Sequence, residues 1–118
     1  MDKIQFIVCG WWYDEFDKKT GQTDFIKSLQ YLNKENDNID VFWTCHKKPP
    51  KIITENFEYQ EYENIGLEWG AYHKAFTDLN LDNGTFIYYI QDDMIIHDWS
   101  FINVCMNHFK NNPKARVI

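Results

Sequence analysis

Three continuous apolar runs constrain the fold of this chain more than any other feature of its sequence. They are Lys3 to Cys9, Ile39 to Cys45 and Thr85 to Ile90. Continuous apolar character over such a short run is typical of a strand that is covered on both faces of a parallel sheet. We expect Thr85 to Ile90 to be the central strand, because it is the most strand-like of the three, with Lys3 to Cys9 beside it.

Segments with other periodicities separate these runs. Apolar residues at helical spacing follow Thr23, which is a candidate helix N-cap, and a second helical stripe begins at Leu67. Phe57 to Tyr62 alternates aromatic and polar residues, which predicts a third strand that is exposed on one face. Pro49 and Pro50 indicate a loop before it. Strands alternating with helices predict an α/β fold with three layers and a mainly parallel sheet.

The length of 118 residues fits a single domain spanning residues 1–118, and no internal repeat or linker divides it. Asp98 or Ser100 is expected to cap a further helix, after which Lys114 to Ile118 begins another strand. A chain that stops inside a strand leaves a sheet unfinished. We therefore expect the domain to be incomplete at its C-terminus.

Charge and cysteine content narrow the classes of function. The formal net charge is −6 and no stripe of lysine and arginine is present, so we expect no nucleic-acid partner. An acidic protein that binds an anionic nucleotide usually needs a divalent cation between the two. The three cysteines are widely separated in apolar runs, which predicts reduced, buried thiols and a cytoplasmic location. No apolar run reaches the length of a signal peptide or a membrane span.

The sharpest chemical signal is the acidic pair that follows the third apolar run. Asp92 and Asp93 stand between Ile90-Gln91 and a second apolar stretch that begins at Met94. Ligands of open parallel sheets bind at the carboxyl ends of strands. Carboxylates between apolar runs are costly unless a partner neutralises them, and a divalent cation with a bound diphosphate would do so. The alternative is an exposed acidic turn.

Two segments resemble GT-A glycosyltransferases, close to family 2 and particularly to its rhamnan-synthesis branch. Thr85 to Asp93 (TFIYYIQDD) resembles the strand and D-x-D loop of that family, and Glu63 to Phe76 (ENIGLEWGAYHKAF) resembles the N-x-G segment and helix that precede it. Gln91 departs from the pattern, since many members have the first aspartate there. The resemblance is strongest from Phe57 to Ile118.

The resemblance implies a nucleotide-diphosphate sugar donor, a hydroxyl acceptor such as a glycan, and a Mn²⁺ or Mg²⁺ ion. By position, Asp93 would ligate the metal, and Asp92 would assist at the metal or at the donor ribose. The donor would also meet the side chains or backbone of Trp11, Trp12, Tyr13, His46, Asn64 and Gly66. His97 is a remote candidate for a third ligand. In inverting members the catalytic base belongs to a later half, so it is expected beyond Ile118.

Each of these assignments has a structural alternative. Trp11 to Tyr13 also suit packing against their own loop, and His46 suits a solvated loop. Asn64 and Gly66 equally suit a turn before a helix. Two other functions therefore stay open, namely a non-catalytic module that binds a nucleotide sugar or a metal, and an α/β phosphohydrolase that uses Asp92 as its nucleophile.

Overall fold

The computed structural model describes residues 2–10, 22–92, 96 and 98–115 of the chain. The elements in chain order are β1 (Ile4–Gly10), α1 (Gln22–Glu35), β2 (Ile39–Cys45), α2 (Lys51–Thr54), β3 (Glu58–Glu61), α3 (Leu67–Leu79), β4 (Phe86–Gln91) and α4 (Phe101–Asn111). The alternation of strands and helices confirms the predicted α/β class.

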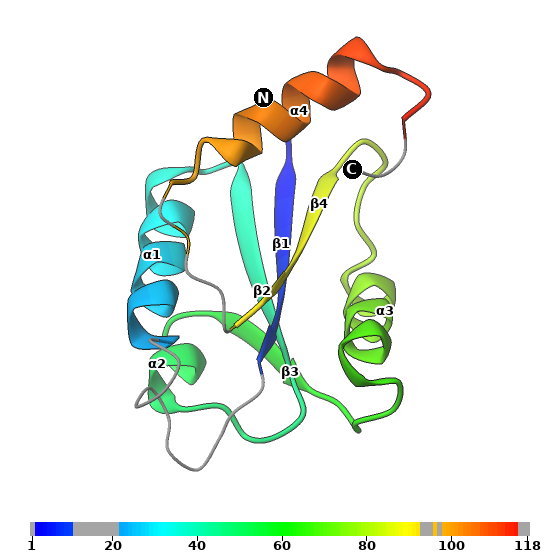
Figure 1. Ribbon diagram of the computed structural model, residues 1–118. Helices are drawn as coiled ribbons and strands as arrows, with labels where there is room; N and C mark the ends of the chain where they lie inside the picture. The colour runs from blue at the N-terminus through cyan, green and yellow to red at the C-terminus, as the bar shows by residue number, and fades with distance from the viewer. Residues whose placement is uncertain (1, 11–21, 93–95, 97, 116–118) are drawn as a thin grey trace.

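The four strands form one sheet in the order β3-β2-β1-β4, and every pair in it is parallel. β1 aligns with β2 from Ile4 opposite Ile39, and with β4 from Ile4 opposite Phe86. All carboxyl ends therefore point to one edge of the sheet, at the lower side of Figure 1. The mainly parallel sheet predicted from the sequence is confirmed.

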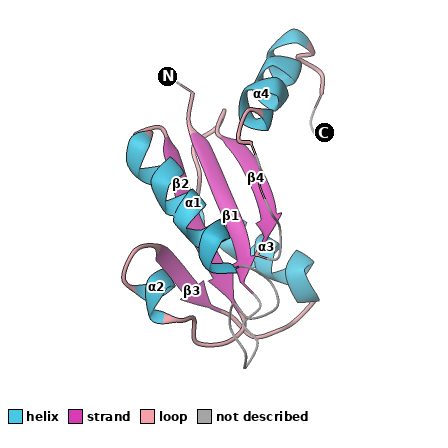
Figure 2. Cartoon of the chain, turned by 60° about the vertical axis from the view of Figure 1, so that its left-hand side comes forward, coloured by secondary structure: helices cyan, strands magenta, loops and turns pink. Residues whose placement is uncertain are grey.

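Helices cover both faces of the sheet, as Figures 1 and 2 show, with α1 and α2 on one face and α3 on the other. The larger core joins the first face to α1, α2 and α4, and includes Phe6, Trp43, Leu29, Ile53 and Ile102. The smaller core lies under α3, where Ile7, Cys9 and Phe42 pack against Ala71, Tyr72 and Ala75. The apolar runs of β1 and β2 are thus explained by cover on both sides.

The prediction that Thr85 to Ile90 is the central strand was wrong. Within the sheet formed by the described residues, β4 is an edge strand, although it does pair with β1 as expected. Its apolar run contains two tyrosines that combine a packed ring with a polar end. The Tyr88 hydroxyl donates to the Ile102 carbonyl at 2.9 Å, while Tyr89 is half-exposed. Amphipathic rings make an edge strand look like a buried one in sequence.

Three local predictions also need correction. Thr23 lies inside α1, which begins at Gln22, so it is not the N-cap. The loop after β2 ends sooner than expected, because the short helix α2 starts directly after Pro50, whose fixed φ suits a helix start. Ser100 occupies the N-cap position of α4 as expected, but its side chain makes no capping hydrogen bond; its backbone N–H and its hydroxyl donate to Asp98 instead.

Candidate functional site

The strand order locates the candidate site. The chain moves outward from β1 through β2 to β3 and then returns to the other side of β1 to form β4. The order therefore reverses between β1 and β4, and open α/β sheets bind ligands outside the carboxyl ends of the strands at such a reversal. Gly10 and Gln91 end the two strands that border this point.

Asp92 lies at this reversal. Its backbone N–H donates to the Cys9 carbonyl at 3.1 Å, which continues the pairing of β4 with β1 by one residue. The residue is only 4% exposed, so its carboxylate is held within the protein and not in an exposed acidic turn. A buried carboxylate fixed at the end of a parallel strand is the most constrained acidic group that the structure describes.

The start of α3 forms the neighbouring wall. Gly66 adopts a left-handed conformation with φ of 82°, and Leu67 follows with φ of 54°. The turn then packs so tightly that a Cβ atom on Gly70 would lie 1.7 Å from the Ile65 carbonyl oxygen. This close approach sets the position of Glu68 in the first helical turn. The Gln91 side-chain amide donates to the Glu68 carboxylate at 3.3 Å, which joins α3 to the end of β4.

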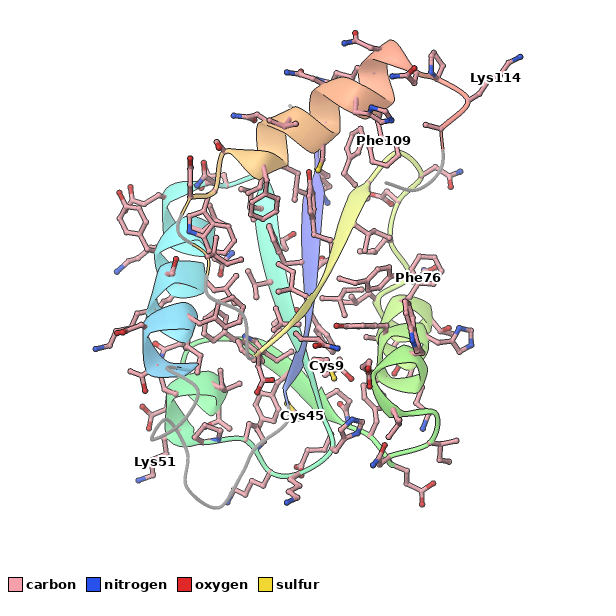
Figure 3. All side chains as sticks on the ribbon, in the orientation of Figure 1. Cys9, Cys45, Lys51, Phe76, Phe109 and Lys114 are labelled. Atoms are coloured by element: carbon pink, nitrogen blue, oxygen red, sulfur yellow. The ribbon has the colours of Figure 1, made fainter. Side chains whose placement is uncertain are left out.

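Two carboxylates act on the thiol of Cys9 near the end of β1. The pKa of the Cys9 thiol is raised to about 12, mainly by burial and in addition by the charges of Asp92 and Glu68. The two carboxylates therefore both act on the end of β1. Cys9 therefore stays protonated at neutral pH and is not a thiolate nucleophile. Figure 3 shows Cys9 and Cys45 at this end of the sheet.

His46, directly after β2, belongs to the same edge. Burial lowers the pKa of its imidazole, while Glu68 raises it and Lys74 lowers it. The imidazole is therefore neutral at pH 7 and offers one donor and one acceptor. Lys74 itself donates to the Glu63 carbonyl at 3.4 Å and lies 5.9 Å from the centre of the Tyr62 ring.

The structure brings several of the predicted site residues to one edge. Asp92, His46 and the turn with Asn64 and Gly66 all follow carboxyl ends of strands in this sheet. Trp11, Trp12, Tyr13, Asp93 and His97 lie outside the described residues. A cleft shared by all of these residues therefore stays a prediction.

Sequence reasoning missed the part played by Cys9 and Lys74. Cys9 was identified only as a buried thiol, although its position as the next-to-last residue of β1 placed it at the carboxyl edge. Nothing in the sequence indicates a role for Lys74, because its effect on the pKa of His46 depends on how α3 crosses the sheet. The expectation of three buried cysteines needs one correction: Cys9 and Cys45 are buried, whereas Cys105 is half-exposed, and none forms a disulfide.

The polar groups at this edge include carboxylates and an amide, whose oxygens suit Mg²⁺ and Mn²⁺, and a neutral imidazole, which is a nitrogen ligand. No group of three or more potential ligand side chains close enough to hold a metal occurs within residues 2–10, 22–92, 96 and 98–115. Two open hollows, of about 130 and 430 Å³, lie toward the opposite edge, next to Gln5 and Asp40. That edge carries the amino ends of the strands, where parallel sheets rarely bind ligands.

Comparison with protein-family models, with curated protein sequences and with solved structures returned no match to the chain. In the part of the chain that the structure describes, no helix has both the length and the apolar character needed to cross a bilayer.

Proposed function

We propose that this chain binds a nucleotide-diphosphate sugar through a Mn²⁺ or Mg²⁺ ion, as part of a glycosyltransferase of the GT-A type. The observation that carries the proposal is the buried carboxylate of Asp92 at the reversal of strand order. It supports a ligand site because open α/β sheets bind ligands at such a reversal, and carboxylate oxygens are ligands that Mg²⁺ and Mn²⁺ prefer.

The residues present fit a hard divalent cation. Asp92 and Asp93 would hold it, and the ion would neutralise charge that develops on the leaving diphosphate. Glu68 and Asp92 act on the same thiol, so a cation between them and an anionic ligand would offset their repulsion of that ligand. Asn64 and Gly66 would form the turn that contacts the donor, since the positive φ of Gly66 would let the backbone approach the donor closely.

The neutral imidazole of His46 offers a hydrogen-bond acceptor or donor to the base or a phosphate. Trp11, Trp12 and Tyr13 would stack on the base, as the resemblance implies. A cytoplasmic location and an acceptor hydroxyl on a glycan are part of the same proposal.

Isothermal titration calorimetry tests the metal bridge. UDP-glucose, GDP-mannose and dTDP-rhamnose are titrated with Mn²⁺ and, separately, with a chelator. We expect weak binding of one donor in Mn²⁺ only, its loss in Asp93→Asn and Asp92→Asn, and a much smaller effect of Gln91→Ala. Asp37→Asn is the matched control, because Asp37 is an exposed acid in the turn before β2, at the opposite edge.

The outcomes separate the alternatives. Binding that is equally tight in chelator, or unchanged in Asp93→Asn, would refute the metal bridge. Release of inorganic phosphate from a phosphomonoester, lost in Asp92→Asn, would favour the phosphohydrolase instead. Metal-dependent donor binding without transfer to any tested acceptor would favour the non-catalytic binding module, whereas transfer of the sugar to an acceptor would favour the transferase.

A further inference from the structure

A band of aromatic rings faces solvent beside the candidate site. Trp69 on α3 is 75% exposed, and Phe76 on α3 and Tyr89 on β4 are each 46% exposed. Trp69 and Tyr89 contact the ring of Tyr72, which is buried, and Phe76 lies one helical turn after Tyr72 on α3. We call Trp69, Tyr72, Phe76 and Tyr89 the aromatic platform. α3 lies across the sheet from α1 in Figure 1, and Figure 3 labels Phe76 on it.

The platform is held rigidly. The Tyr72 ring lies 4.9 Å from the Tyr89 ring and 6.2 Å from the Trp69 ring, measured between centroids. Tyr72 is in turn fixed in the core under α3, beside Ile7 and Phe42. Rings that are anchored in this way lose little conformational entropy on binding, so they present ready-made contact surface. Single exposed apolar residues need no explanation, but contiguous ones mark binding surfaces.

Polar groups border the same rings. Glu68 precedes Trp69 on α3, and Gln91 lies two residues after Tyr89, on the same face of β4. Their side chains hydrogen-bond to each other at 3.3 Å, and Gln91 is exposed. An amide and a carboxylate together provide donors and acceptors in a plane. The surface thus joins apolar ring faces to a fixed hydrogen-bonding pair.

We propose that the aromatic platform binds a neutral saccharide. A pyranose ring has apolar C–H faces that pack on aromatic rings, and hydroxyl groups at its rim that need paired donors and acceptors such as Gln91 and Glu68. An anionic nucleic acid or an anionic lipid surface is disfavoured by the net charge of −6. A stable protein interface takes about 20–30 residues a side, many more than this platform offers.

The platform continues into the candidate donor site. Glu68 is shared, because its charge acts on Cys9 and His46 at the carboxyl edge while its carboxylate accepts from Gln91. A saccharide on the rings would therefore lie next to the donor sugar, where an acceptor must be. This assignment as the acceptor rests on the proposed function, whereas saccharide binding itself does not.

Titration with cellohexaose, maltohexaose and chitohexaose tests the platform, by ¹H–¹⁵N chemical-shift perturbation and calorimetry. We expect binding of at least one of them, with shifts centred on the Trp69 indole and on residues 87–91. Trp69→Ala should weaken binding at least about tenfold, equivalent to about 1.4 kcal/mol. Gln91→Ala should weaken it less. Both side chains are exposed, so neither variant threatens folding.

Tyr31→Ala is the matched control, because Tyr31 is an equally exposed ring, at 69%, on α1. It should leave binding unchanged. Any of three results would overturn the proposal. These are the absence of binding to all three oligosaccharides, a loss of saccharide affinity in Tyr31→Ala equal to that in Trp69→Ala, and a concentration-dependent dimer that Trp69→Ala dissociates. Asp93→Asn separates it from the donor site: saccharide binding should survive in that variant. Nucleotide binding with no saccharide binding would refute the platform alone.

Discussion

Replacing Gly70 by alanine tests the tight turn that positions the start of α3. Gly70 has no positive φ, so alanine is not excluded by its backbone conformation. In an open helix the substitution would stabilise the protein by about 1 kcal/mol, because alanine has the higher helix propensity. Here the new Cβ would lie 1.7 Å from the Ile65 carbonyl oxygen and 2.8 Å from its carbon. Ordinary contact begins at 3.4 Å, so the first separation must roughly double.

The atom in the way is backbone, which cannot turn aside as the end of a side chain can. The turn must shift or the first turn of α3 must open, with loss of the hydrogen bond from the Gly70 N–H to the Gly66 carbonyl, now 3.1 Å. Overpacking of this kind costs about 1–3 kcal/mol, and occasionally more. A clash with backbone at this distance belongs at the upper end of that range, about 3 kcal/mol, so with the propensity gain subtracted we expect Gly70→Ala to lower the free energy of unfolding by about 2 kcal/mol. At roughly 5 °C per kcal/mol the Tm falls by about 10 °C.

Urea unfolding followed by circular dichroism measures the change, with Gly84→Ala as the comparison. Gly84 has φ of 89°, and a Cβ atom added there would have nothing within 4 Å, so alanine meets conformational strain without a clash. That strain costs about 1 kcal/mol. A Gly70→Ala variant that is as stable as the parent, or more stable, would show that the turn does not approach the helix so closely. The turn would then not be what positions Glu68 next to Gln91.

Three further predictions concern other contacts. Trp99→Phe keeps an aromatic ring but loses the indole N–H that donates to the Ser28 hydroxyl at 2.8 Å. A double-mutant cycle with Ser28→Ala, measured by urea unfolding, should therefore give a coupling free energy of about 1 kcal/mol. Additive effects of the two substitutions would contradict the hydrogen bond. Burial lowers the pKa of His46 in the folded state, so the unfolded state binds its proton more readily and the free energy of unfolding should fall as pH drops through and below 6.5. His46→Gln should flatten this dependence of stability on pH. An unchanged pH dependence in His46→Gln would refute the lowered pKa. Because the pKa of Cys9 is raised to about 12, mass spectrometry should find it alkylated by iodoacetamide at pH 8 far more slowly than half-exposed Cys105, and equal rates would argue against a buried, protonated thiol.

The strands and the long helices were predictable because their signals are local. β2 occupies the expected run from Ile39 to Cys45, and α3 coincides with the stripe from Leu67 to Leu79. Both depend on periodicity that the core enforces directly. α2 was missed because four residues are too few to show a period, and its start directly after Pro50 reads equally as a loop.

The position of β4 at the edge was not predictable from its composition. Apolar content reports how much of a strand is covered, whereas the order of strands depends on where each connection crosses. Tyr88 and Tyr89 count as apolar in a run, yet one hydroxyl bonds to the backbone of α4 and the other ring lies half-exposed.

The candidate site shows where sequence reasoning ends. That Asp92 follows a strand is evident from the sequence, and the strand-end rule then places it at a ligand-binding edge. That Glu68 acts on the same thiol as Asp92 depends on the path of α3 over β1, which no spacing encodes. Glu68 is therefore the residue through which the two proposals meet. If it serves both, Glu68→Gln should weaken metal-dependent nucleotide binding and saccharide binding together, whereas Trp69→Ala should weaken only the second. If Glu68→Gln changes neither affinity in calorimetry, Glu68 takes part in neither binding event, and the platform and the donor site do not share this residue.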